Sequence, residues 1–174
     1  KGGRKGAPKF PMPDNFAWLQ AYSYFTANEE AQQVWLTTLD NLAAGGIYDH
    51  LGGGFARYST DANWLVPHFE KMLYDNSQLV SLYSKAFAST GNELYKRRIE
   101  ETLAFIAREQ TDKDGRFYAS LDADSDGEEG KFYVWTTQEI DSLLSTDEAI
   151  LIKAYYRFRN KGNWEEGKNI LHTS

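Results

Sequence analysis

Six segments of this 174-residue chain carry the apolar spacing or the capping residues of α-helices, and they limit the folds open to it. The segments cover 14–28, 29–44, 67 to about 89, 92 to the turn at 112–115, about 137–144 and about 147–158. Between these helices, two connections longer than about 15 residues are too rich in aromatic residues to be disordered. The sequence therefore predicts an all-α fold in which two long loops carry short strands.

Local signals support the individual helices. In the second segment, Val34, Trp35, Leu39 and Leu42 fall on one apolar stripe, which Gly45-Gly46 ends. In the fourth, Asn92 is a capping residue, and Tyr95, Ile99, Leu103 and Ile106 are expected to face inward. Thr136 with Glu139 and Ser145 with Glu148 have the spacing of capping boxes at the start of the last two helices.

The two long connections resemble each other. Each opens with glycine and aromatic residues, passes acidic residues and a turn, and leads into a new helix, which gives a weak repeat of about 69 residues. Helical hairpins repeated in this way stack as a solenoid or close into a toroid with the long loops at one end. The alternative is a plain helical bundle with two unrelated loops.

The composition excludes several classes of site and partner. The chain contains no cysteine, so disulfides, thiolate metal sites and cysteine nucleophiles are absent. The net charge is −6, and the lysine and arginine residues are scattered along the chain. The sequence therefore predicts no basic patch that would bind nucleic acid or an anionic membrane. No apolar run has the length of a membrane span, and the first residues lack the apolar core of a signal peptide. We therefore expect a cytoplasmic chain with neither nucleic-acid nor membrane partners.

The first long connection holds most of the candidate binding residues. Its glycines 52–54 predict a turn or a close backbone approach, since the lysine and the context of a phosphate loop are missing. Aromatic rings stack on sugar faces, while carboxylates and guanidinium groups bond hydroxyls, so a polyhydroxylated ligand fits the side chains around these glycines. The candidates are Tyr48, Asp49, His50, Arg57, Tyr58, Asp61 and Trp64.

Pro67 predicts the start of a helix, with His68, Lys71 and Asp75 near one face. In its first turn, the helix dipole would lower the pKa of His68 and favour the neutral imidazole that a general base needs. The alternative is that His68 bonds a loop carbonyl. Glu70 is either a charge at the helix start or an acid in a cavity.

The second connection contains five acidic residues around Gly127. Asp122, Asp124 and Asp126 match the first half of a calcium loop, but position twelve is Tyr133 instead of glutamate, so the EF-hand motif fails. A solvated acidic turn with Asp122 pointing inward is expected, and a looser calcium or magnesium site is the alternative. We assign no metal ligands and no cofactor.

Five stretches together resemble one known family: GAPKFP at 6–11, GGIYDHLGGGFARYSTD at 45–61, WLVPHFEKMLYDN at 64–76, DADSDGEEGKFYVWT at 122–136 and GKNILH at 167–172. This is a thioredoxin-domain-containing family of largely undefined activity. Its members join an N-terminal thioredoxin-like domain to an α/α toroid similar to N-acylglucosamine 2-epimerases and six-hairpin glycosidases. The start, KGGRKGAPKF, departs from the family pattern.

The resemblance implies that residues 1–174 form the first half of such a toroid, with the thioredoxin-like domain before residue 1 and further hairpins after residue 174. It also implies a sugar-like small molecule in the cavity. The first hypothesis is an epimerase- or isomerase-like domain with His68 as base and Tyr58 or Glu70 assisting.

A second hypothesis is hydrolysis of a sugar linkage by carboxylates such as Asp49, Asp75 or Asp122, and a third is a binding or scaffolding domain without catalysis. Half a toroid would expose apolar helix faces, so self-association is expected as well.

Overall fold

The computed structural model describes all residues from 1 to 174, and about half of them are helical. The six α-helices are α1 (Pro13–Thr26), α2 (Glu29–Ala44), α3 (Leu73–Thr90), α4 (Glu93–Glu109), α5 (Thr137–Leu143) and α6 (Thr146–Tyr155). The prediction of a helical fold with six helices is confirmed, while closure into a toroid stays a prediction.

Short strands occur only in antiparallel pairs. The pairs are β1 (Lys71–Met72) with β2 (Ser120–Leu121), β3 (Asp124–Ser125) with β4 (Glu128–Glu129), and β5 (Val134–Trp135) with β6 (Asn169–Ile170). Two short 3-10 helices, η1 (Lys131–Tyr133) and η2 (Glu165–Gly167), complete the elements. Because β1 lies at the end of the first long connection and β2 lies in the second, this pair holds the two connections together.

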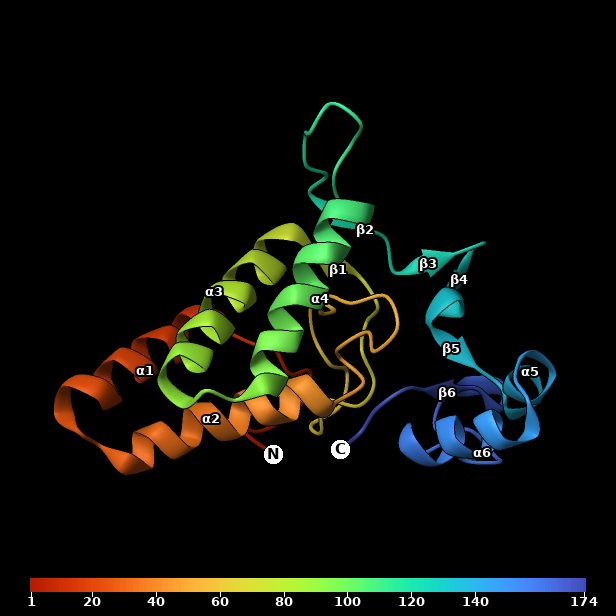
Figure 1. Cartoon of the computed structure of the whole chain (residues 1–174), viewed down its shortest axis with the longest axis horizontal. Helices are drawn as coiled ribbons and strands as arrows, with labels where there is room; N and C mark the ends of the chain where they lie inside the picture. Colours follow the sequence, from red (N-terminus) through yellow and green to blue (C-terminus); the bar gives the residue numbers. More distant parts are fainter.

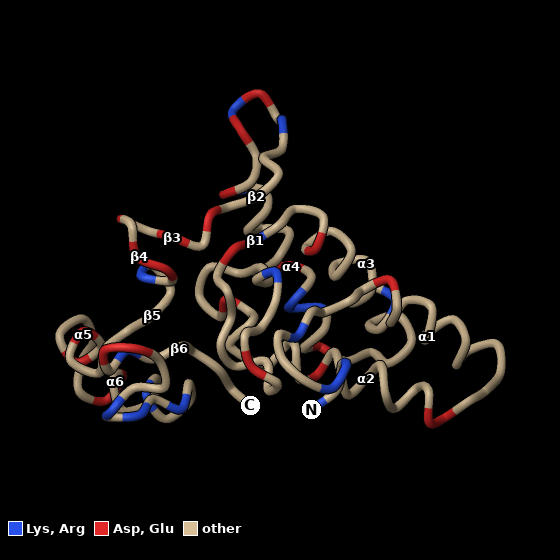
Figure 2. Tube along the Cα trace, turned by 180° about the vertical axis from the view of Figure 1, so that it is seen from behind, with Lys and Arg blue, Asp and Glu red and all other residues tan.

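The elements form two bodies of unequal size. Helices α1 to α4 make the helical body, and α5 and α6 with β5 and β6 make a smaller C-terminal lobe (Figure 1). An arm between α4 and β2 projects away from both, and it carries acidic and basic residues side by side (Figure 2). The end of the chain returns to the helical body, where the backbone N–H of Thr173 donates to the carbonyl of Ala44 at 2.8 Å.

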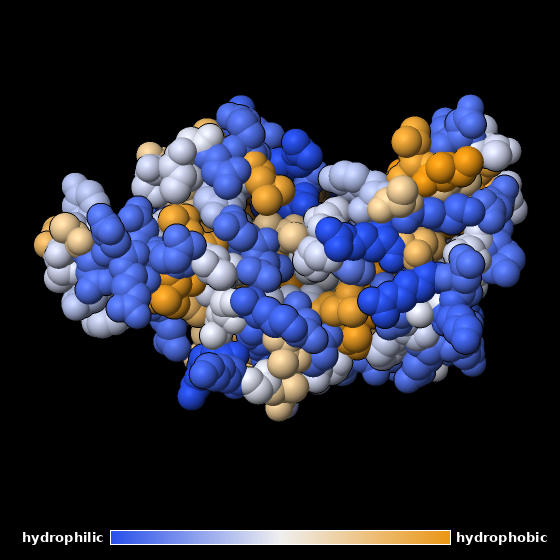
Figure 3. Space-filling model, turned by 90° about the horizontal axis from the view of Figure 1, so that it is seen from below, coloured by the Kyte–Doolittle hydropathy of each residue, from blue (hydrophilic) through white to orange (hydrophobic).

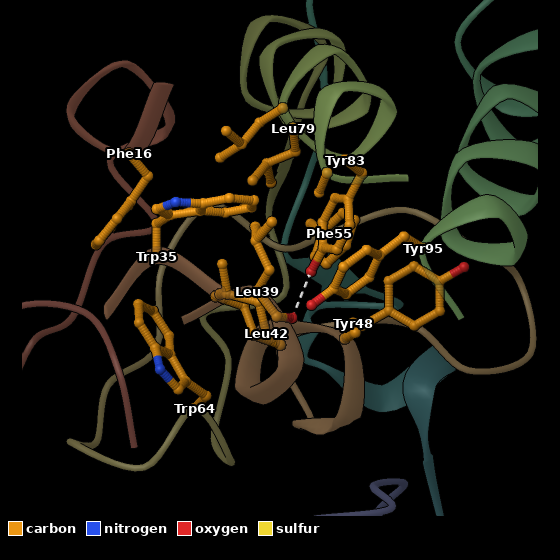
Figure 4. Packing of buried hydrophobic residues seen from close by; sticks show 14 of the residues in the cluster. Phe16, Trp35, Leu39, Leu42, Tyr48, Phe55, Trp64, Leu79, Tyr83 and Tyr95 are labelled. Carbon is orange, nitrogen blue, oxygen red and sulfur yellow. Dashed lines mark hydrogen bonds between the residues drawn. The ribbon is translucent and has the colours of Figure 1, made fainter. Parts of the chain in front are cut away.

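The main core lies inside the helical body, where α3 packs on both α4 and α1. Trp35 and Leu39 of α2 and Tyr83 of α3 are almost completely buried there (Figure 4). The Tyr83 hydroxyl donates to the Leu39 carbonyl at 2.8 Å, so its polar end is satisfied within the core. Tyr48 and Phe55 of the first connection belong to the same cluster, which anchors that connection to the helices.

Helix boundaries follow local capping signals. Helix α2 has the predicted bounds, and the Asn92 side chain caps α4 by accepting from the backbone of Leu94. Both predicted capping boxes are present, at Thr136 and at Ser145. Gly45 ends α2 in an extended conformation, however, and not in the left-handed conformation usual for such a glycine.

Some apolar side chains face outward. Val34 and Leu103, both expected to point inward, are about half exposed because each lies at the margin of its helix's buried stripe. Exposed apolar groups also occur on α1 and α6, and Figure 3 shows apolar patches over both ends of the molecule. Self-association through such surfaces stays a prediction. None of the helices combines the length and the apolar character needed to cross a membrane.

Candidate functional site

The helix predicted to begin at Pro67 begins at Leu73 instead. Pro67 pairs with Ser59 in an isolated β-bridge, and the residues that follow hydrogen-bond to the backbone of residues 57 and 58. This pairing with a distant segment outweighs the local helix signal. His68 therefore lies outside α3, and the proposed effect of the helix dipole on this residue has no structural basis.

The same pairing sets the register of the first connection. The backbone N–H of Arg57 donates to the Glu70 carbonyl at 2.8 Å, and that of His68 donates to the Tyr58 carbonyl at 3.0 Å. Side chains therefore meet in pairs: the Tyr58 and His68 rings stack with centroids 4.8 Å apart, and Arg57 Nη1 lies 3.1 Å from Glu70 Oε2. These four candidate residues, which lie close together in the sequence, are thus also in contact in the structure.

Phe69 occupies an unusual backbone conformation between these neighbours. Its φ of 60° is in the left-handed region, and the Glu70 N–H donates back to the His68 carbonyl at 2.8 Å, which closes a tight turn. The Phe69 ring packs against Gly130, where an added Cβ would come within 2.4 Å of the ring. Gly130 therefore lets the second connection approach Phe69 closely.

The acidic stretch of the second connection is a β-hairpin. Strands β3 and β4 are joined by Asp126-Gly127, and both residues have positive φ, as a two-residue type I′ turn requires. The hairpin ends at Glu129, directly before Gly130, and this places the Glu129 carboxylate against His68. Glu129 was missed as a candidate, although Asp-Gly between paired acidic residues is a recognised hairpin signal.

We call the resulting group the polar cluster: Arg57, Tyr58, His68, Glu70, Asp75 and Glu129. His68 Nδ1 lies 2.8 Å from Glu129 Oε1. An ionised carboxylate only accepts hydrogen bonds, so the proton of the neutral imidazole lies on Nδ1 and Nε2 carries the free lone pair. The His68 side chain is about one-third exposed, and Nε2 makes no hydrogen bond within the chain.

Asp75, in the first turn of α3, is partly buried and has one carboxylate oxygen without a partner. Its Oδ2 atom is inaccessible to water and accepts no hydrogen bond. Burial raises the pKa of Asp75 to about 6, an effect that the positive charge of Arg57 opposes and the negative charge of Glu70 increases. The protonated and ionised forms of Asp75 therefore coexist close to neutral pH.

A separate cavity of about 420 Å³ lies between the helical body and the C-terminal lobe, and we call it the interlobe pocket. Alternate residues of the segment after the β-bridge line it: Pro67, Phe69 and Lys71 do, whereas His68 and Glu70 do not. The other lining residues are Gly46, Ile47, Tyr48, Asp49, His50, Leu51, Gly52, Ala56, Phe132, Tyr133, Trp135, Ile170 and Leu171.

Asp49 and Lys71 form a buried ion pair in the wall of this pocket. Lys71 Nζ lies 2.7 Å from Asp49 Oδ2 and 2.9 Å from the Gly53 carbonyl, and it sits over the rings of Phe105 and Tyr133. Burial lowers the pKa of Lys71, and the charge of Asp49 opposes that shift. Asp49 Oδ1 accepts from two backbone N–H groups, so neither partner keeps an unsatisfied atom.

Tyr48 and His50 are also bonded inward. The Tyr48 hydroxyl donates to Glu101 at 2.6 Å, and burial raises the pKa of this phenol. His50 Nε2 lies 3.0 Å from the Gly45 carbonyl, and Arg98 approaches its Nδ1 at 3.4 Å. Burial, with the charge of Arg98, lowers the pKa of His50 to about 4, so the imidazole is neutral.

The remaining sequence candidates lie outside both sites. Trp64 is fully buried in the core, and its indole N–H donates to the Lys1 carbonyl at 2.9 Å. Asp61 accepts from the backbone of its own turn, including Val66 N–H at 2.6 Å. Asp122 was expected to point inward, but it is exposed and accepts from the backbone of Asp124 at 3.3 Å.

The glycine run has the structural role that the sequence favoured. An added Cβ at Gly53 would come within 2.5 Å of the Glu101 carbonyl oxygen, so the turn packs directly on α4. Nowhere do three or more aspartate, glutamate or histidine side chains gather closely enough to share a metal ion.

Comparison with known proteins identifies homologues of this chain, but their names state no biochemical activity. No model of a known protein family matches the chain. The human protein named spermatogenesis-associated protein 20 is 46% identical over 155 residues, which are 82% of this chain and 20% of the human protein. The mouse protein of the same name is 44% identical over 155 residues, 82% of this chain and 19% of that protein.

An uncharacterised protein of Caenorhabditis elegans is 35% identical over 182 residues, which are 93% of this chain and 25% of the worm protein. The chain thus spans about a fifth to a quarter of the length of the curated relatives it matches. Over most of its own length, the chain is homologous to a segment of proteins named spermatogenesis-associated protein 20.

Proposed function

We propose that the polar cluster binds a polyhydroxylated, sugar-like molecule and moves a proton on it, as an epimerase or isomerase does. His68 acts as the general base, and Glu70 or Tyr58 assists. The observation that carries the proposal is the 2.8 Å contact between His68 Nδ1 and Glu129 Oε1. A carboxylate that holds one ring nitrogen protonated fixes the tautomer and orients the other nitrogen as a base.

Other members of the polar cluster support the same chemistry. Tyr58 stacks on the His68 ring and is itself covered by Phe10 at 4.8 Å, so the imidazole is held in one orientation while the Tyr58 hydroxyl makes no hydrogen bond within the chain. Asp75, whose pKa is about 6, can supply a proton near neutral pH. Epimerisation removes a proton from one face of a carbon and returns a proton to the other face. It therefore needs a base and an acid, and their environments must set different pKa values.

The groups around this pair suit hydroxyl recognition. Arg57 offers several N–H donors, Glu70 offers acceptor oxygens, and the half-exposed ring of Tyr74 lies beside them on α3. Sugar ligands use this combination, because their hydroxyls need charged or polar partners while their C–H faces pack on aromatic rings.

The test is proton exchange on neutral and N-acetylated hexoses in heavy water, followed by NMR. Deuterium incorporation at a carbon, with or without an epimerised product, would establish proton transfer. We expect His68→Gln to abolish it, whereas His172→Gln, a histidine outside the cluster, should leave it unchanged. Equal exchange with the parent and the His68→Gln variant would contradict the role of His68.

A second pair of variants separates positioning from folding. Glu129→Gln removes the carboxylate that contacts His68, and Glu128→Gln changes the adjacent residue, which pairs with Lys131 instead. We expect only Glu129→Gln to lower kcat with little change in KM and to alter the ratio of His68 tautomers in ¹⁵N NMR spectra. Identical spectra and rates for both variants would remove Glu129 from the mechanism.

One observation favours a binding domain without catalysis as the second candidate. Glu70 is already paired with Arg57, and the pair can hold a ligand without exchanging a proton. Saturable binding of a hexose, with no exchange in any sample, would favour this function over an epimerase or isomerase. Hydrolysis by two carboxylates would appear in the same spectra as cleavage when a disaccharide is supplied.

A further inference from the structure

We propose that the interlobe pocket is a second binding site, which takes a neutral, flat aromatic molecule carrying one carbonyl or hydroxyl group. This inference is independent of the sugar-directed function, because it concerns different residues on the other side of the Phe69 turn. It rests on the volume and position of the cavity, on the pairing of its charges and on the side chains that line it.

The size and position of the pocket suit a small molecule. Its volume of about 420 Å³ lies within the range of ligand cavities, roughly 300 to 1,000 Å³. Its walls come from both bodies of the molecule, with Ile47 and Phe69 on one side and Trp135 and Ile170 on the other. Sites between two lobes are a common location for ligands, because neither lobe fills the space alone.

The charges in the pocket are already satisfied. Asp49 and Lys71 neutralise each other at 2.7 Å, and His50 is held neutral with its Nε2 bonded to Gly45. Four buried side-chain atoms of the chain lack a hydrogen-bond partner, and none belongs to a residue that lines the pocket. A charged ligand would lose its hydration there without gaining a partner, so a neutral ligand is favoured.

Two polar groups remain available and define the ligand further. Tyr133 and Trp135 line the pocket, and neither the Tyr133 hydroxyl nor the Trp135 indole N–H donates a hydrogen bond within the chain. Burial raises the pKa of Tyr133 to about 12, so its hydroxyl stays protonated and can donate. These donors fit a single neutral oxygen acceptor on an otherwise apolar ring system.

The rim of the pocket presents an aromatic side chain to solvent. Phe132 lines the pocket and is nevertheless 72% exposed. A ligand entering the cavity would cover this ring and remove apolar surface from water. Because Phe132 carries little packing in the free chain, its truncation can test binding without unfolding the protein.

The probe is the neutral fluorophore 6-propionyl-2-dimethylaminonaphthalene, whose emission shifts to the blue in apolar surroundings and whose carbonyl supplies the acceptor. We expect saturable 1:1 binding with a blue shift and a change in the NMR signal of the Trp135 indole N–H. The anion 1-anilinonaphthalene-8-sulfonate should bind at least about tenfold more weakly, because the pocket offers no free cation.

Phe132→Ala and Phe25→Ala form a matched pair, since both residues are exposed and only Phe132 lines the pocket. We expect Phe132→Ala to weaken binding of the neutral probe at least about fivefold and Phe25→Ala to leave it unchanged. Equal weakening by both, tighter binding of the anion, or no saturable binding up to the solubility limit of the probe would overturn the proposal.

Discussion

The interlobe pocket and the polar cluster share the segment from Pro67 to Lys71, but they balance their charges differently. In the pocket, Lys71 and Asp49 bond to each other and to nearby backbone groups, so the pair is fully satisfied. In the polar cluster, Asp75 keeps a buried oxygen without a partner, and Nε2 of His68 is unbonded within the chain. One short segment therefore separates a site with no free charge from a site with unsatisfied proton donors and acceptors.

This difference indicates distinct roles for the two sites. From the sequence, the residues of both were predicted to form one sugar-binding site. A fully paired wall adds rigidity and suits a ligand that needs no charge. An unpaired carboxyl group costs stability, and such groups are retained where they take part in binding or catalysis. The comparison therefore predicts opposite outcomes for substitutions on the two sides of Phe69.

The largest effect is expected from breaking the buried ion pair. Lys71→Met leaves Asp49 buried without its cation, and we expect a loss of about 3–5 kcal/mol in the free energy of unfolding. Urea unfolding monitored by circular dichroism measures this loss. Arg57→Met removes the cation of the partly exposed pair with Glu70 in the polar cluster and should change the midpoint only slightly.

A double variant shows whether the unpaired charge causes the loss. Asp49→Asn keeps Oδ1 as the acceptor for the backbone of Leu51 and Gly52 while removing the charge. In the Lys71→Met background it should therefore recover part of the lost stability. A double variant no more stable than Lys71→Met alone would mean that packing, and not charge, explains the loss.

Local signals explain which parts of this fold were predictable. The bounds of α2 and the capping boxes at Thr136 and Ser145 depend on residues within four positions of each other, and all three predictions are confirmed. The positive φ of Gly53 and its close approach to α4 likewise follow from the glycine run.

The polar cluster depends on contacts between distant residues, and the sequence gives little information about them. His68 and Glu129 are 61 positions apart, and the pairing of residues 57–58 with 68–70 replaced a helix that the local pattern predicted. The prediction failed because backbone pairing with Tyr58 and Arg57 satisfies the same N–H and C=O groups as a helix would. Asp126-Gly127 was the available signal for the hairpin, and hence for the position of Glu129.

A second, smaller effect is expected on the stability of the fold at acid pH, and it comes from His50 in the wall of the pocket. The pKa of His50 is about 4 in the folded chain, below its ordinary value near 6.5, so the unfolded chain binds more protons between these values. Stability should therefore fall as the pH is lowered from about 6.5 to 4, by up to about 3 kcal/mol. Urea midpoints measured across this range test the slope.

His50→Gln is the informative variant, because the glutamine side chain can still donate to the Gly45 carbonyl and cannot titrate. We expect it to flatten the profile between pH 6.5 and 4 while keeping most of the stability at pH 7. Burial also lowers the pKa of His172, so a smaller slope of the same sign should remain. An unchanged profile would show that His50 becomes accessible before it is protonated.

The smallest effect is expected at Asp75, and its sign is opposite. Its pKa is raised to about 6, so the folded chain holds the proton more tightly than the unfolded chain, and stability is lost as the pH rises from about 4 to 6. Asp75→Asn removes this cost, so the variant should be more stable than the parent at pH 7 and nearly equal to it at pH 4. Partial exposure of Asp75 makes this gain smaller than the His50 effect.

Asp126→Asn is the matched control, because Asp126 is exposed at the hairpin turn. This substitution should leave the pH profile of stability unchanged. Lower stability of Asp75→Asn at pH 7 would mean that Asp75 stabilises the fold through the charge of Arg57. Higher stability, together with loss of proton exchange on the sugar, would identify Asp75 as a group kept at the expense of stability. In that case the unpaired oxygen of Asp75 is explained by a role in proton transfer. The residues that line the pocket have no such unpaired atom, because their site does not transfer protons.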